Sequence, residues 1–150
     1  MEKTTSSHYN INYHFVWCPK YRKEFLVGEI ASFTQNIIET ICSSKKWKLL
    51  ELQIMPDHIH LFISTPPYEN PTGIIKVLKG TTAIQIFKKF PKNRLKFRKG
   101  HIWSPSYYVG TAGTVTAETI KKYIKEQERE NNRNSSPKQV KGSPCDFGGL

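Results

Sequence analysis

The chain of 150 residues predicts an α+β domain with the ferredoxin-like order βαββαβ and one additional helix near its C-terminus. Three observations lead to this prediction. Strand-like alternation opens the chain and returns in its middle, helical periodicity follows each of these regions, and the composition becomes polar after residue 128. We therefore expect one domain over residues 1–128 and a polar, flexible tail over residues 129–150.

The first predicted strand covers residues 9–18, where aromatic and polar residues alternate. Phe15 and Trp17 lie on its apolar face, and His14 lies on its polar face. A basic turn over residues 19–23 ends the strand. Apolar residues then recur at helical spacing from residue 29 to residue 44, which predicts the first helix.

A β-hairpin is predicted next. Residues 47–55 form its first strand, Pro56 and Asp57 form the turn, and the second strand begins at His58. Because Pro-Asp is common turn chemistry, we assign Asp57 to the turn and not to a metal site. Antiparallel pairing of the two strands follows from the short connection.

The remaining elements are a second helix, a fourth strand and a final helix. The second helix follows Pro71, and a break or kink is considered at residues 80–82. The fourth strand is predicted at residues 103–109. Gly110 and Gly113 then flank a flexible connection to a helix over residues 116–128.

The charge balance favours a polyanionic partner. The sequence contains 23 Lys and Arg against 12 Asp and Glu, which gives a formal net charge of +11. No apolar run approaches the roughly 20 residues that cross a bilayer, and the first ten residues lack a secretory signal. The scattered cysteines form no CxxC pair. These features favour a cytoplasmic protein that binds nucleic acid and no membrane.

His58 and His60 are the strongest candidates for a metal site. Residues at spacing i, i+2 share one face of a strand, so the two imidazoles lie side by side while Ile59, Leu61 and Ile63 face the core. Two imidazoles would leave positions open on a divalent ion for substrate oxygens. Mn²⁺ is a better match to histidine than Mg²⁺, and zinc stays an alternative. The plainer interpretation is a pair of solvent-facing polar residues.

Tyr123 and Gln127 lie one helical turn apart and share one face of the last predicted helix. A catalytic role would make Tyr123 the nucleophile and Gln127 an oxygen donor to the metal, whereas the plainer interpretation is two surface side chains. His14 could approach the site only if its strand neighbours the histidine strand, and we do not include it.

Nucleic acid contacts are predicted where cations and aromatic residues alternate in the sequence. Two segments have this pattern. The candidates are Lys20, Tyr21, Arg22 and Lys23 in the first turn, and Arg94, Lys96 and Arg98 in the basic segment that follows the second helix.

With these motifs in order, the chain resembles the IS200/IS605-family transposases, which are single-domain tyrosine transposases of the HUH superfamily. The resemblance rests on YHFVWCPKYR at residues 13–22, MPDHIHL at residues 55–61, and Tyr123 with Gln127. It covers roughly residues 8–128.

The resemblance implies a DNA transposase that cleaves and rejoins single-stranded DNA at hairpin-marked element ends. In this family the counterpart of Tyr123 forms a 5′-phosphotyrosine link, and the counterparts of His58, His60 and Gln127 hold Mg²⁺ or Mn²⁺. It also implies a homodimer in which active sites are shared between subunits, with the glycine connection as a hinge.

Three other functions fit some of the same residues. A domesticated relative that processes repeated palindromes would share every residue named above. A non-catalytic single-stranded DNA-binding module would use only the basic surface. A metal-dependent hydrolase would use water in place of Tyr123.

Overall fold

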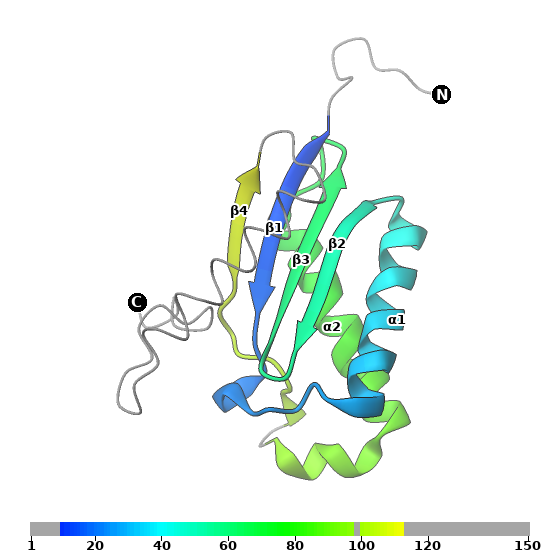
Figure 1. The fold of residues 1–150 in the computed structure, drawn as a ribbon, viewed down its shortest axis with the longest axis vertical. Coiled ribbons are helices and arrows are strands. Elements are labelled where there is room, and N and C mark those ends of the chain that lie inside the picture. Colours follow the sequence, from blue (N-terminus) through cyan, green and yellow to red (C-terminus); the bar gives the residue numbers. More distant parts are fainter. Residues whose placement is uncertain (1–9, 98–99, 113–150) are drawn as a thin grey trace.

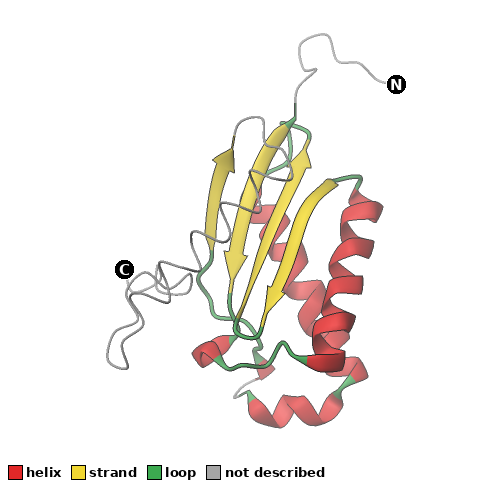
Figure 2. Cartoon of the chain, viewed as in Figure 1, coloured by secondary structure: helices red, strands yellow, loops and turns green. Residues whose placement is uncertain are grey.

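The computed structural model describes residues 10–97 and 100–112. In this part of the chain, an antiparallel four-stranded sheet has the order β2-β3-β1-β4, and α1 and α2 cover one of its faces (Figures 1 and 2). The elements are β1 (Ile11–Trp17), η1 (Lys20–Arg22), α1 (Gly28–Lys45), β2 (Lys48–Met55), β3 (His58–Thr65), α2 (Pro71–Lys89), η2 (Pro91–Lys96) and β4 (Tyr108–Ala112). The predicted α+β class and βαββαβ order are confirmed. The helix predicted at residues 116–128 and the tail at 129–150 lie outside the described residues.

The main core lies between the sheet and the two helices. The sheet contributes the odd-numbered residues of β1 and β3, which the alternation in the sequence assigned to this face. The helices contribute apolar side chains one turn apart, with Ile38 of α1 and Leu78 of α2 both completely buried. Burying a side chain of this size stabilises the fold by about 1.5–3 kcal/mol. The sheet is therefore held rigidly from one side.

β3 is the best-protected strand. It pairs with β1 on one side and β2 on the other, and all eight of its residues are buried. His58 is 7% exposed and His60 is 0% exposed, so the interpretation of both as solvent-facing residues is wrong. The even-numbered face of β3 is covered as well as the odd-numbered one.

α2 is a continuous helix. The Asn70 side chain caps its N-terminus by accepting a hydrogen bond from the Thr72 backbone N–H at 2.8 Å, and Pro71 occupies the first turn, where a missing N–H costs nothing. The break considered at residues 80–82 does not form. The hydroxyl of Thr82 instead bonds back to the Leu78 carbonyl at 2.7 Å, inside the helix.

β4 begins later than predicted. The strand predicted at residues 103–109 forms only from Tyr108 onward, because Trp103 makes only an isolated bridge to Pro19, and Pro105 cannot donate to a sheet. The apolar character of Trp103 reflects a buried loop: its indole N–H donates to Thr82 Oγ1 at 3.0 Å.

Gly110 lies within β4, directly opposite His14 of β1. The prediction that Gly110 forms part of a hinge is therefore wrong, because it belongs to a paired strand. Gly113 lies outside the described residues. None of the helices in the described part is long and apolar enough to span a membrane.

Candidate metal centre

The two histidines of the sequence motif lie together at the start of β3. Their ring centroids are 4.9 Å apart and the rings are nearly perpendicular, at 82°. Within the described part of the chain, the Nε2 atoms of both His58 and His60 are buried without a hydrogen-bond partner. A buried polar atom left unpaired costs about 1–3 kcal/mol, so two such atoms in one place suit a ligand that accepts nitrogen lone pairs.

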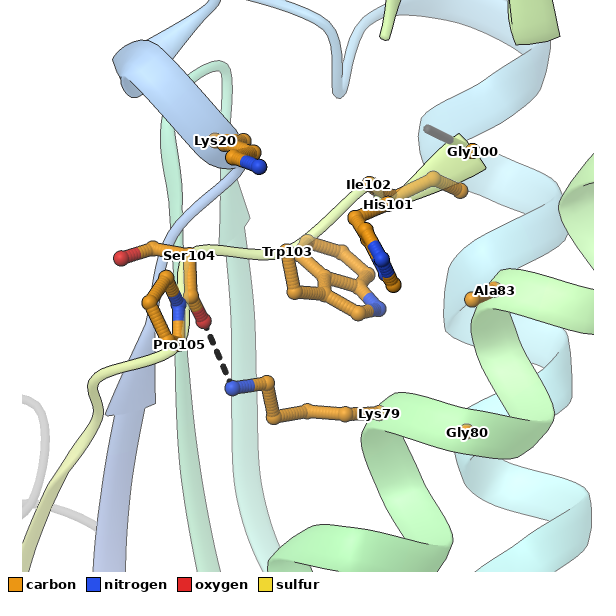
Figure 3. Close-up of a pocket in the computed structure, with 10 residues that line it drawn as sticks. All are labelled: Lys20, Lys79, Gly80, Ala83, Gly100, His101, Ile102, Trp103, Ser104 and Pro105. Carbon is orange, nitrogen blue, oxygen red and sulfur yellow. Dashed lines mark hydrogen bonds between the residues drawn. The ribbon is translucent and has the colours of Figure 1, made fainter. Parts of the chain in front are cut away.

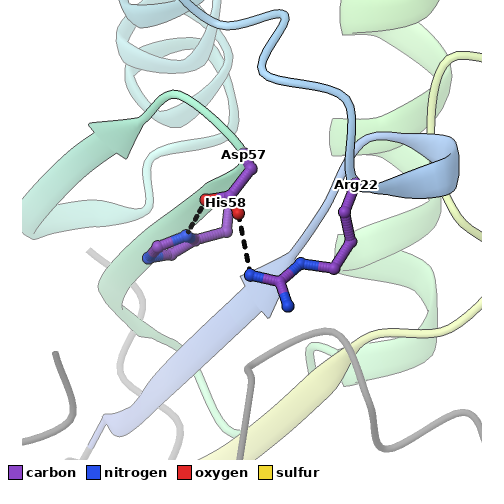
Figure 4. A network of polar contacts seen from close by, with 3 residues as sticks. All are labelled: Arg22, Asp57 and His58. Carbon is purple, nitrogen blue, oxygen red and sulfur yellow. Dashed lines mark hydrogen bonds and ion pairs between the residues drawn. The ribbon is translucent and has the colours of Figure 1, made fainter. Parts of the chain in front are cut away.

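Asp57 orients the first of these rings. Its Oδ1 lies 2.7 Å from His58 Nδ1, and its Oδ2 accepts a hydrogen bond from Arg22 at 2.7 Å (Figure 4). The hydrogen bond with His58, the charge of that histidine and the Arg22 guanidinium together lower the pKa of Asp57 to about 2, against an opposing effect of burial. An ionised carboxylate only accepts hydrogen bonds, so His58 donates from Nδ1, and the neutral form of this ring has its lone pair on Nε2.

Asp57 occupies the turn between β2 and β3, as predicted. The sequence analysis missed its second role, as the partner that orients His58. Strand parity places Asp57 and His58 on opposite sides. The turn breaks this parity and lets the carboxylate reach the ring of the next residue.

His14 joins the site from the neighbouring strand. Its Nε2 lies 3.1 Å from His60 Nδ1, and the two rings are stacked with centroids 5.4 Å apart. Burial lowers the pKa of His14 to about 4. Burial, then the nearby His58 and His14, lower the pKa of His60 to about 3. Both rings are therefore neutral at pH 7. The condition under which His14 was expected to approach the site is met, because β1 is the neighbour of β3.

The turn that follows β1 has a strained backbone. Tyr21 and Arg22 have φ angles of 62° and 51°, in the left-handed region that costs about 1–3 kcal/mol for a residue with a side chain. Backbone bonds from Lys20 N–H to Ile102 O at 2.6 Å and from Arg22 N–H to Pro19 O at 2.9 Å hold the turn. This conformation directs Arg22 to Asp57.

The predicted nucleic acid contacts in this turn are partly exposed. Tyr21 is 64% exposed, and the Lys20 ammonium lies 5.6 Å from the centre of its ring. Lys23 is exposed, with its ammonium 5.7 Å from the Phe97 ring. Arg94 and Lys96 belong to η2, but their side chains lie outside the described part, as does all of Arg98.

A hollow of about 410 Å³ lies beside the same turn (Figure 3). Lys20 and Lys79 contribute cations to its lining, which contains no acidic residue. The Lys79 ammonium donates to the Ser104 carbonyl at 2.7 Å, and burial lowers its pKa. Lys20 therefore links the predicted contact turn to a basic concavity.

The site is incomplete within residues 10–97 and 100–112. These residues contain no cluster of three or more His, Cys, Asp or Glu side chains that could hold a metal ion. Tyr123 and Gln127, the predicted nucleophile and third ligand, lie outside the described residues. In the described residues, the structure assembles a pair of imidazoles, each with a buried, unpartnered Nε2 and a partner at Nδ1.

Comparison with known proteins agrees with the motif analysis. The family model described as "Transposase IS200 like" matches residues 7–127. The ISDra2 transposase TnpA of Deinococcus radiodurans is 35% identical over 127 residues, which cover 85% of this chain and 91% of the relative.

Solved structures share the fold. A crystal structure from Deinococcus radiodurans, described as that of a transposase, has a TM-score of 0.68 at 34% identity and covers 85% of this chain and 98% of its own. A REP-associated tyrosine transposase, solved with a REP hairpin bound, has a TM-score of 0.54 at 12% identity and covers 84% of this chain and 67% of its own. At that identity the second likeness concerns the fold alone.

Proposed function

The chain belongs to the family of IS200-like transposases, and from this premise we propose that it cleaves and rejoins single-stranded DNA at hairpin-marked element ends. The net charge of +11 suits a DNA substrate. The observation that supports the chemistry most directly is the pair of buried, unpartnered Nε2 atoms of His58 and His60 in the described part of the chain.

These two residues fit a divalent metal. Each ring has a partner on Nδ1, which is the arrangement that keeps a metal-binding imidazole in one orientation. His58 and His60 would hold Mg²⁺ or Mn²⁺ together with Gln127, and the imidazole pair favours Mn²⁺. When bound, the ion would neutralise charge on the scissile phosphate and orient it for in-line attack.

Tyr123 is the proposed nucleophile. Its phenolic oxygen gives up its proton and forms a bond to phosphorus while the bond from phosphorus to the 3′ oxygen breaks. The departing 3′ oxygen takes up a proton, so the step is balanced. The products are a 5′-phosphotyrosine and a free 3′-hydroxyl. That hydroxyl can attack another such linkage, so that strands are rejoined without hydrolysis.

The proposed DNA path includes the turn at residues 20–23. Tyr21 is exposed and can stack on an unpaired base, while Lys20 and Lys23 can contact the backbone. Arg94, Lys96 and Arg98 are proposed as further backbone contacts. A hairpin is the proposed form of the substrate, in line with the hairpin bound to the REP-associated relative.

We further propose a homodimer with shared active sites, acting in the prokaryotic cytoplasm.

The test incubates the full-length protein with single-stranded oligonucleotides from the flanks of its own gene and Mn²⁺ or Mg²⁺. Denaturing gels should show a metal-dependent protein–DNA adduct. Tyr123→Phe should abolish the adduct, while Tyr68→Phe, at a tyrosine that is 83% exposed, should leave it unchanged. An adduct that persists in Tyr123→Phe would refute the mechanism.

The other outcomes separate the alternatives. Free 5′-phosphate ends without an adduct would indicate a metal-dependent hydrolase, and tight binding without any cleavage would indicate a binding module. A domesticated palindrome-processing enzyme is separated by its genomic surroundings, because a mobile element should have matching hairpins on both sides of its gene.

A further inference from the structure

We propose that His14 is a positioning residue of the metal centre: its Nε2 accepts the Nδ1 proton of His60 and thereby keeps the His60 lone pair on Nε2. This inference rests on the proposed function, since it assigns a role to His14 through the metal-binding residue His60. It extends the site to a residue of a second strand, β1.

The number of protons available to the two rings supports donation from His60 to His14. Two ring nitrogens 3.1 Å apart share one proton, so either His14 or His60 donates. If His14 donated, His60 would carry its own proton on Nε2, which is buried without an acceptor in the described part of the chain. If His60 donates, Nε2 has a lone pair for a metal ion. Only the second arrangement leaves no ring nitrogen of His60 unsatisfied once a metal binds.

His58 provides a parallel within the same site. Its Nδ1 donates to the Asp57 carboxylate at 2.7 Å, which in the neutral imidazole leaves the lone pair on Nε2. Both imidazoles therefore have a partner at Nδ1 and an unpartnered Nε2 within the described residues. An orienting partner on the second nitrogen is the usual support of a histidine ligand. Asp57 and His14 supply it from a turn and from a neighbouring strand.

The ring of His14 is itself held in place by aromatic side chains of the two neighbouring strands. Phe62 of β3 stacks on it with centroids 4.2 Å apart and an angle of 4°, and Tyr108 of β4 approaches edge-on at 5.6 Å. Gly110 leaves the room that this arrangement needs, because a Cβ at that position would lie 2.6 Å from the Tyr108 hydroxyl. His14 is 3% exposed. An acceptor fixed in this way can hold His60 in one orientation.

The test compares the Mn²⁺ affinity of the wild type with that of three variants, measured by calorimetry on metal-free full-length protein. His14→Phe keeps an aromatic ring for stacking but removes the acceptor, and should weaken binding about 10- to 100-fold. His14→Gln restores an acceptor at a similar reach and should recover most of the affinity. His101→Phe, the same exchange at an exposed histidine, is the matched control and should bind like the wild type.

Two results would overturn the inference, and they are distinguishable. If the wild type binds Mn²⁺ and His14→Phe binds it equally well, His14 only packs and the positioning role fails. If the wild type binds no Mn²⁺, the metal site of the proposed function fails, and the role of His14 fails with it.

The wild-type protein offers a test that does not depend on how a variant folds. Long-range nitrogen–proton NMR of the metal-free protein, with ¹⁵N-labelled histidine, identifies the protonated nitrogen of each ring. We expect His60 to carry its proton on Nδ1 and His14 to lack one on Nε2. A proton on His60 Nε2 would overturn the inference.

Discussion

Replacing Asp57 by asparagine removes the one charge that contacts both Arg22 and His58. The carboxylate lies 2.7 Å from each partner. An amide oxygen can still accept one hydrogen bond, but it is neutral and cannot attract the guanidinium as strongly. We therefore expect Asp57→Asn to lower both the free energy of unfolding and the affinity for metal.

The size of the stability loss follows from the pKa of Asp57, which is lowered from 3.8 to about 2. A difference of about two pH units corresponds to about 2–3 kcal/mol. The side chains of Arg22 and Asp57 are 32% and 24% exposed, so solvent screening reduces this to about 1–2 kcal/mol at pH 7. Because folding lowers the pKa of this acid, the contribution is complete above about pH 5 and is lost as the pH falls toward 2.

Urea denaturation of metal-free protein at several pH values measures this contribution. The difference between wild type and Asp57→Asn should be largest above pH 5 and should shrink steadily below pH 4. Glu24→Gln, at an exposed acid, controls for the loss of a negative charge. A difference that stays constant down to the lowest pH at which both proteins fold would refute the assignment to this carboxylate. Mn²⁺ affinity should fall about 10- to 100-fold, because His58 loses its charged partner.

Three further results are expected from the described part of the chain. The free energy of unfolding of the metal-free protein should fall as the pH drops below 6.5, because His14 and His60 take up protons in the unfolded chain but stay neutral in the fold down to about pH 4. Uptake of two protons on unfolding corresponds to about 2.7 kcal/mol per pH unit. If the pH dependence of the free energy of unfolding, measured by urea denaturation, corresponds to fewer than one proton, it would contradict the burial of both rings. Gly110→Ala should destabilise the protein by about 1 kcal/mol, because the added Cβ would lie 2.6 Å from the Tyr108 hydroxyl. The loss should be smaller in a Tyr108→Phe background, and an equal loss in both backgrounds would contradict this reason. Thr82→Val should cost about 1–3 kcal/mol in the same assay, since it leaves a buried indole N–H without its acceptor, and an unchanged value would contradict that.

The parts of the fold that the sequence predicted well depend on local patterns. Alternation in β1 and β3 and helical spacing in α1 and α2 fix which face of each element is buried, and strand parity alone placed His58 beside His60. The start of β4 was missed because Trp103 is apolar for a different reason, its burial in a loop next to Pro105.

The rest of the candidate site depends on contacts between distant segments. His14 reaches His60 only because β1 and β3 are neighbours, and local sequence periodicity does not predict the order of strands in a sheet. The contact between Arg22 and Asp57 requires two consecutive residues with left-handed backbone angles, and no sequence pattern in the turn predicts them. Tyr123 and Gln127 stay predictions, since they lie outside the described residues.

The central place of β3 has a consequence for how the site withstands fluctuation. Its backbone is hydrogen-bonded to strands on both sides and every residue is buried, so its amides should exchange with solvent deuterium only when the whole sheet opens. The entropy of fixing the two imidazoles is then lost once, during folding, and the proposed metal would find these two side chains already ordered. Substitutions elsewhere in the core should therefore lower the fraction of folded molecules, while each folded molecule keeps its affinity for the proposed metal.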